Sequence, residues 1–194
     1  MITTEELRFI NNLSVLMSLG RPLASSLRSM RETCREPACI AAYDAMIERT
    51  EKGGQFTDVL PDFPQLCSRS VLALLKAARR SSCLAVLLPK LAKLVRATVS
   101  GEWDPRRRFF ETWALMVETG ISNDEALDEL RHDFRRGPLG EVADGLRGAV
   151  DGGKSLADGA ARFPEVFDAT SRDLLHYGEH RDLARALRSI TDLL

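Results

Sequence analysis

Apolar residues recur along the chain at the three- and four-residue spacing of amphipathic helices. The first such series consists of Leu7, Ile10, Leu13, Leu16 and Met17. A period of 3.6 residues per turn places these side chains on one helix face. Gly20, which follows the series, is typical of a helix C-terminus. No alternating pattern and no Asn-Gly hairpin turn indicates a strand, so the pattern predicts an all-α chain.

Capping residues and prolines mark where these helices begin. Thr3 and Glu6 have the spacing of a capping box, in which the hydroxyl and the carboxylate satisfy free backbone N–H groups. Ser122 and Glu125 have the same spacing. Pro37 and Pro138 stand where a further helix begins, since proline suits the first helical turn. These signals predict short helices separated by tight turns.

The same order of residues occurs twice, with an offset close to 100 residues. The matching pairs are Phe9 and Phe109, Gly20 and Gly120, Leu27 and Leu127, Arg31 and Arg131, Asp58 and Asp158, and Phe63-Pro64 and Phe163-Pro164. Such a long period indicates a duplicated domain rather than a solenoid. We therefore predict two tandem six-helix bundles, residues 1–100 and 101–194, and expect Phe63 and Phe163 to be largely buried in them.

The second copy contains an ordered series of short motifs. It reads ETGIS at 118–122, EAL at 125–127, Gly153-Lys154-Ser155-Leu156, RFPEVF at 162–167, and Gly178-Glu179. This series resembles the F domain of type II secretion and type IV pilus assembly-platform proteins. The resemblance covers nearly the whole chain, once per copy. The first copy departs from it where Ala78-Arg79 replaces the Gly-Glu pair.

The resemblance implies six-helix bundles and a non-catalytic scaffold or adaptor. Its implied partners are a secretion ATPase and other platform subunits. Members of this family normally have transmembrane helices after each F domain, but the longest apolar region here is interrupted by bases such as Lys76 and Arg79. The acidic N-terminus, with Glu5 and Glu6, is unlike a signal peptide. We expect a cytoplasmic protein with no membrane span, which reaches the inner membrane through its partners.

Residues that suggest catalysis or a cofactor are few. His176, Glu179 and His180 fit the H-x-x-E-H zinc motif, but Gly178 falls inside the ligand helix and few residues remain for a third ligand. No P-loop and no Ser-His-Asp set occurs, and the cysteines lack C-x-x-C spacing. We expect small buried thiols, no metal, no cofactor and no enzymatic activity.

Charge is divided unequally between the copies. Residues 1–100 hold 14 Lys+Arg and 9 Asp+Glu, net +5, whereas residues 101–194 hold 13 and 19, net −6, which together make the −1 of the whole chain. The candidate docking residues are therefore the bases Lys76, Arg79, Arg80, Lys90, Lys93 and Arg96, the acids Asp124, Glu125, Asp128, Glu129 and Asp133, and Glu179 of the Gly-Glu pair.

These two charged sets suggest docking faces for protein partners or for a head-to-tail homo-oligomer, since complementary fields favour association. The alternative is a small helical nucleic-acid-binding or regulatory protein. No aromatic residue interleaves the bases, so we expect no nucleic acid to bind.

Overall fold

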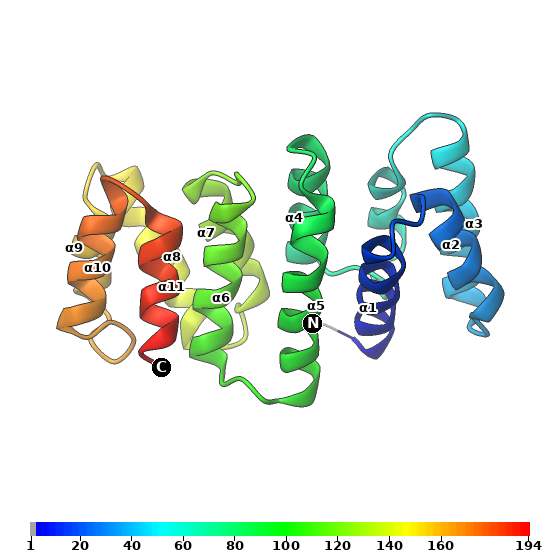
Figure 1. Cartoon of the computed structure of the whole chain (residues 1–194). Helices are drawn as coiled ribbons and strands as arrows, with labels where there is room; N and C mark the ends of the chain where they lie inside the picture. Colours follow the sequence, from blue (N-terminus) through cyan, green and yellow to red (C-terminus); the bar gives the residue numbers. More distant parts are fainter. Residues whose placement is uncertain (1–2) are drawn as a thin grey trace. The chain divides into compact units, whose positions relative to one another are not determined.

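The chain folds into helices throughout the part described by the computed structural model, residues 3–194 (Figure 1). The prediction of an all-α fold is thereby confirmed for those residues. Contacts between the helices divide the chain into two compact units. Unit 1 ends at Ser100, and unit 2 begins at Gly101.

Unit 1 contains five α-helices and two 3-10 helices among its described residues. In order they are α1 (Thr4–Ser18), α2 (Leu23–Thr33), α3 (Pro37–Glu51), η1 (Phe56–Asp58), η2 (Leu60–Asp62), α4 (Arg69–Arg80) and α5 (Leu84–Ser100). The segment before Phe63 forms two 3-10 turns, and Pro61 inside the second of them lacks the N–H that a continuous α-helix would use. Helix α1 packs against both α5 and α2, and α2 packs against α3.

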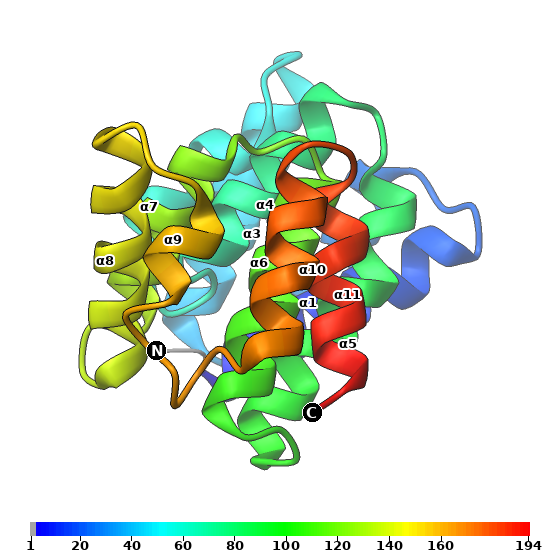
Figure 2. The same ribbon diagram turned by 90° about the vertical axis from the view of Figure 1, so that its left-hand side faces the viewer.

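Unit 2 contains six α-helices. They are α6 (Pro105–Glu118), α7 (Asn123–Asp133), α8 (Pro138–Asp151), α9 (Leu156–Ala160), α10 (Ala169–Glu179) and α11 (Leu183–Asp192). Helices α10 and α11 lie side by side, and the short α9 contacts both α8 and α10 (Figure 2). Helix α11 also packs along α6, as α5 packs along α1 in unit 1.

Left-handed glycines end the first helix of each unit. Gly20 has a φ of 74° and Gly120 a φ of 88°. Each follows a helix whose last carbonyls accept hydrogen bonds from the backbone just beyond it. Glycine adopts this conformation without the steric cost of a Cβ, so the sequence signal at both positions had a direct physical cause.

The capping boxes form only in part. The Thr3 hydroxyl accepts a hydrogen bond from the Glu6 N–H at 3.1 Å, as predicted. The Glu6 side chain, however, is buried and accepts hydrogen bonds from the N–H of Ser68 at 2.5 Å and from its hydroxyl at 2.7 Å. Ser68 is the N-cap of α4 and makes no capping bond with its own side chain. Glu6 therefore connects α1 to the start of α4, a distant contact that local spacing could not show.

The two units have cores of different composition. Unit 2 has an aromatic core, in which Phe110 meets Phe167 edge to face with ring centroids 5.4 Å apart. Phe109 meets Trp113 at 5.9 Å and Phe134 at 5.3 Å. The core of unit 1 is mostly aliphatic, and it includes Leu13, Leu27, Leu60, Leu74 and Leu91, all fully buried.

Phe63 and Phe163 are intermediate in exposure, so each is mostly but not completely buried. In the RFPEVF motif at 162–167, Phe167 is fully buried. The Phe163 carbonyl accepts hydrogen bonds from the N–H groups of Val166 and Phe167. The Phe-Pro pair therefore begins a turn, and the residues after that turn enter the core.

Candidate docking surfaces

The acidic candidates lie on α7, and they do not all face solvent. Asp124 and Glu125 are exposed in the first turn, where acids favour a helix N-terminus through its dipole. Asp128 and Asp133 are half-buried, and Glu129 is buried at 8% exposure. A continuous exposed acidic stripe along this helix is therefore not present.

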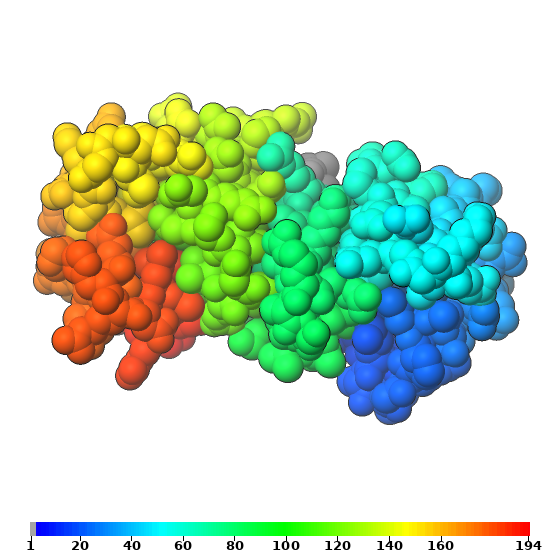
Figure 3. All heavy atoms as spheres, turned by 90° about the horizontal axis from the view of Figure 1, so that it is seen from above, coloured from blue at the N-terminus to red at the C-terminus, as the bar shows by residue number. Residues whose placement is uncertain are grey.

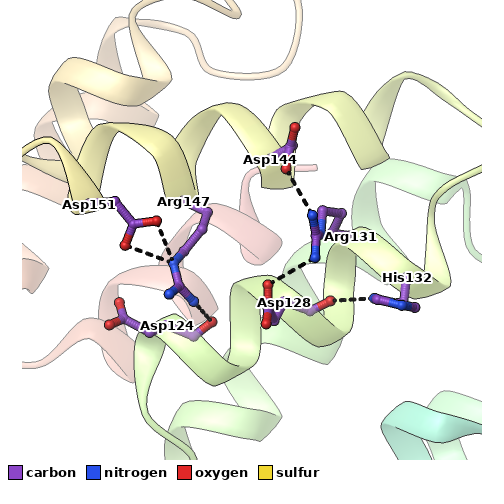
Figure 4. Close-up of polar contacts among 7 residues, drawn as sticks. All are labelled: Asp124, Asp128, Arg131, His132, Asp144, Arg147 and Asp151. Carbon is purple, nitrogen blue, oxygen red and sulfur yellow. Dashed lines mark hydrogen bonds and ion pairs between the residues drawn. The ribbon is translucent and has the colours of Figure 1, made fainter.

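An arginine pairs with one of these acids, Asp128, within unit 2. Arg131 lies between two carboxylates, with Nη2 at 3.3 Å from Asp128 Oδ1 and Nη1 at 3.4 Å from Asp144 Oδ1 (Figure 4). Asp144 belongs to α8, so Arg131 connects the two helices across their polar edge. His132 places Nδ1 at 3.2 Å from the Asp128 carbonyl oxygen on the same helix.

Arg147 makes a second link between α7 and α8. Its Nε donates to both carboxylate oxygens of Asp151, at 3.0 and 3.1 Å, and its Nη1 donates to the Asp124 carbonyl at 2.8 Å (Figure 4). The hydrogen bond with Asp151 raises the pKa of Arg147 above its usual value. This cluster of acids and arginines stabilises the packing of α7 on α8, and part of its negative charge is compensated locally.

The pair Arg131–Asp144 has a counterpart in unit 1. Arg31 Nε donates to Asp44 Oδ1 at 2.9 Å, joining α2 to α3 at positions exactly one hundred residues earlier. The match of Arg31 with Arg131 is evident from the repeat, and Asp44 and Asp144 have the same offset but were not among the predicted residues. The shared ion pair indicates a structural role common to both units.

The basic candidates lie on the last two helices of unit 1. Lys76, Arg79 and Arg80 are on α4, with Arg79 and Arg80 exposed at its C-terminus and Lys76 half-buried. Lys90, Lys93 and Arg96 are exposed on α5, and Arg96 Nη2 donates to Asn11 Oδ1 of α1 at 3.0 Å. Helices α4 and α5 pack against each other, and both reach the surface seen in Figure 3. The structure therefore brings all six bases onto one helix pair.

Glu179 has a specific local role in unit 2. Its Oε1 accepts a hydrogen bond from the N–H of Leu156 at the start of α9, so the Glu of the Gly-Glu pair links the end of α10 to α9. His176 and His180 meet edge to face with ring centroids 5.4 Å apart. Over residues 3–194, no group of three or more His, Cys, Asp or Glu residues could hold a metal ion.

The cysteines differ in burial. Cys39 and Cys67 are buried and Cys34 and Cys83 are half-exposed, so the expectation of buried thiols holds for two of the four. Desolvation raises the pKa of Cys39 to about 11 and that of Cys67 well above its usual value. Both buried thiols therefore remain protonated at neutral pH, and only a thiolate is a strong nucleophile.

A family model identifies the chain. The model described as "Type II secretion system (T2SS), protein F" matches residues 9–108 and matches again at residues 109–194. The chain belongs to the T2SS protein F family. The two matched segments follow the two units closely, although the family boundary falls inside α6 rather than at the Ser100–Gly101 junction. No curated protein matches the chain.

The match also places the basic and the acidic candidate residues in two domains of the same type. Each F-type segment of the chain contains a first helix with a buried face and a repeated arginine–aspartate pair. Helices α4–α5 and α7–α8 differ in charge from their counterparts in the other segment. None of the helices in the described part of this T2SS protein F chain is both long enough and apolar enough to cross a membrane.

The stability of unit 2 should fall in acid because of the N-cap of α10. The Asp168 carboxylate accepts a hydrogen bond from the Ser171 N–H at 2.7 Å, which lowers the pKa of Asp168 below its usual 3.8. A depressed folded-state pKa adds stability above the unfolded-state pKa, and that stability is lost as the pH falls through the folded-state value. We expect the melting temperature of unit 2 to drop between about pH 5 and about pH 2.5.

An Asp168→Asn variant tests the cause, since asparagine also caps helices but does not titrate. The acid-induced drop should be smaller in this variant than in the native protein, while Asp173→Asn, an exposed change on the same helix, serves as the control. Tryptophan fluorescence reports on unit 2, because Trp103 and Trp113 both lie in that unit. Identical pH dependence in native and Asp168→Asn proteins would contradict the prediction.

Proposed function

We propose that the chain is a non-catalytic scaffold or adaptor of a type II secretion or type IV pilus assembly platform. It docks a secretion ATPase or other platform subunits on the cytoplasmic side of the inner membrane. The observation that carries this proposal is the match of the T2SS protein F family to two consecutive segments of the chain. A fold made of two helical units presents long exposed helix faces, which suit protein docking.

The distribution of polar groups supports the proposal. In unit 2, the carboxylates around Arg131, Arg147 and Arg188 serve helix packing, and Arg188 joins α11 to α6 through Glu111 and Glu118. The buried thiols Cys39 and Cys67 are held protonated. These groups act in structure, so binding is the activity that this arrangement favours.

Affinity purification from the native host tests the proposed function. A tagged full-length chain should enrich the secretion ATPase and the platform subunits of that host, relative to a tagged helical protein of similar size and net charge. A host strain that lacks the chain should lose secretion or pilus assembly and regain it when the gene is restored. Normal secretion and pilus assembly in that strain, together with no enrichment of these subunits, would overturn the proposal.

A further inference from the structure

Helices α4 and α5 form a region of unit 1 with no acidic residue. Between Asp62 and Glu102 the sequence contains no Asp or Glu. The same stretch contains the bases Arg69, Lys76, Arg79, Arg80, Lys90, Lys93 and Arg96. Helical surfaces usually mix both signs of charge, so a run of this length with bases alone needs an explanation.

Several bases elsewhere in unit 1 are paired with carboxylates. Arg31 pairs with Asp44, and Arg49 Nη2 lies 3.0 Å from Asp58 Oδ2. Arg28 pairs with Glu51 in the same way. The absence of acids from α4 and α5 is therefore specific to these two helices.

Unit 2 provides an internal comparison, because α10 and α11 occupy the same place in the repeat as α4 and α5. The matching stretch of unit 2 contains acids throughout, including Asp168, Asp173, Glu179, Asp182 and Asp192. Three of them serve the fold: Asp168 caps α10, Asp182 caps α11, and Glu179 holds Leu156. The F-type fold is thus compatible with acidic residues on this helix pair, and packing does not account for their absence from unit 1.

The end of α4 carries two adjacent exposed arginines. Arg79 and Arg80 are exposed, and among the contacts described for residues 3–194 neither is paired with a carboxylate. The hydrogen bond from Arg49 is the main reason that the pKa of Asp58 is lowered, and Lys76, one turn before the arginines, adds a smaller electrostatic contribution. Val86, 66% exposed, lies in the first turn of α5. A single exposed apolar residue is common on protein surfaces, so the arginines carry the argument for binding.

We propose that the C-terminal turn of α4 and the first turns of α5 bind an acidic segment of a partner protein. This surface, defined by Lys76, Arg79, Arg80 and Val86, supplies guanidinium groups that can bind carboxylates bidentately. The proposal deepens the proposed function, on which it rests, by assigning one docking site and the chemistry of its partner.

Other anionic ligands fit this surface less well. Single-stranded nucleic acids stack their bases on exposed aromatic rings, but Phe9, Phe56 and Tyr43 of unit 1 are buried. A helix that lies on an anionic membrane needs a broad apolar face with residues such as Trp, Phe or Leu. The exposed large apolar residues of α5 are instead Val86 and, nearly four turns away, Val99, which helical geometry places on different faces. An acidic protein segment is therefore the occupant that this surface favours.

A labelled peptide of about twenty residues, with glutamates on one helix face, is the probe for the full-length chain. Its affinity should fall about tenfold in an Arg79→Gln/Arg80→Gln variant, because each lost carboxylate contact costs about 0.7 kcal/mol. Glutamine avoids placing a negative charge at the C-terminus of α4. Raising the salt from about 50 mM to about 500 mM should weaken binding to the native chain, since screening shortens the reach of surface charge.

Arg135→Gln/Arg136→Gln is the matched control. It removes two adjacent, exposed arginines from the turn between α7 and α8 of unit 2, so both variants change the net charge equally. Equal loss of affinity in the two variants, or no loss in either, overturns the assignment of the surface. Circular dichroism checks that both variants are folded.

Two further probes separate the partner classes. Tighter binding of a single-stranded oligonucleotide, or of vesicles that contain phosphatidylserine, than of the acidic peptide also overturns the proposal. Co-purification of platform subunits distinguishes a failure of the proposed scaffold function from a failure of the proposed docking site on α4 and α5. If the Arg79→Gln/Arg80→Gln variant still binds the peptide while the native chain enriches platform subunits, only the docking site is wrong.

Discussion

Replacing Phe110 with alanine should destabilise unit 2 by about 3–5 kcal/mol, because the side chain is fully buried and the change leaves a cavity. Phe110 touches Phe109 and Phe167 edge to face, so the substitution removes two aromatic contacts as well as buried area. A loss of this size is a large part of the stability of a domain of about a hundred residues. The melting temperature should fall by roughly 20 °C.

Tryptophan fluorescence is the measurement for this variant, since Trp113 is fully buried in the same core. Tyr177→Ala is the control: it truncates another aromatic residue of unit 2, but one that is 57% exposed, and it should cost less than about 1 kcal/mol. A loss below about 1 kcal/mol for Phe110→Ala would show that the aromatic cluster does not determine the stability of unit 2.

Features of the fold that depend on neighbouring residues were predictable from the sequence. The spacing of Leu7, Ile10 and Leu13 gave the first helix, and Gly20 gave its end. Pro37 and Pro138 stand at the first positions of α3 and α8, as their restricted φ favours. The family resemblance, based on an ordered series of motifs, is confirmed by the two matched segments.

Features that depend on distant contacts were not predictable in this way. The capping-box spacing of Thr3 and Glu6 is the same whether the carboxylate turns back to its own helix or reaches Ser68, and only the fold decides between them. Likewise, the Phe-Pro motif indicates a repeated apolar position in each copy, but it does not show that Phe163 keeps some exposure at a turn while Phe167 is fully buried. An apolar residue beside a proline does not by itself reveal which way its side chain points.

The charged candidates illustrate the same limit. Helical spacing alone places Glu125 and Glu129 on the same ridge of α7, yet Glu125 is exposed and Glu129 is buried. A stronger indication of a structural role is the repeated offset of Arg31 with Arg131 and of Asp44 with Asp144, because these residues form the same ion pair in both units. Charges that match between the copies serve the fold. Charges that differ, such as Arg79 opposite Glu179, are better candidates for a function specific to one unit.

The Gly of the Gly-Glu pair has a packing role that predicts a second large effect. A Cβ on Gly178 would lie 2.5 Å from the Cβ of Ala186 and 3.3 Å from the Cα of Leu183, both on α11. The first distance is well below van der Waals contact, and neither atom is the end of a flexible side chain, so α10 and α11 would have to move apart. We expect Gly178→Ala to destabilise unit 2 by about 1–3 kcal/mol, the usual cost of overpacking.

Two further variants separate this steric effect from helix propensity. Gly148 lies in α8 of the same unit, and a Cβ there would meet no atom within 4 Å. Gly148→Ala should therefore stabilise unit 2 by about 0.5–1 kcal/mol, the opposite sign for the same chemical change. Adding Ala186→Gly to Gly178→Ala removes the clashing methyl group, so the double variant should be more stable than the sum of the single changes by about 1 kcal/mol. Additive effects in chemical unfolding, or destabilisation by Gly148→Ala equal to that by Gly178→Ala, would show that the close approach of α10 and α11 is not the reason for this glycine.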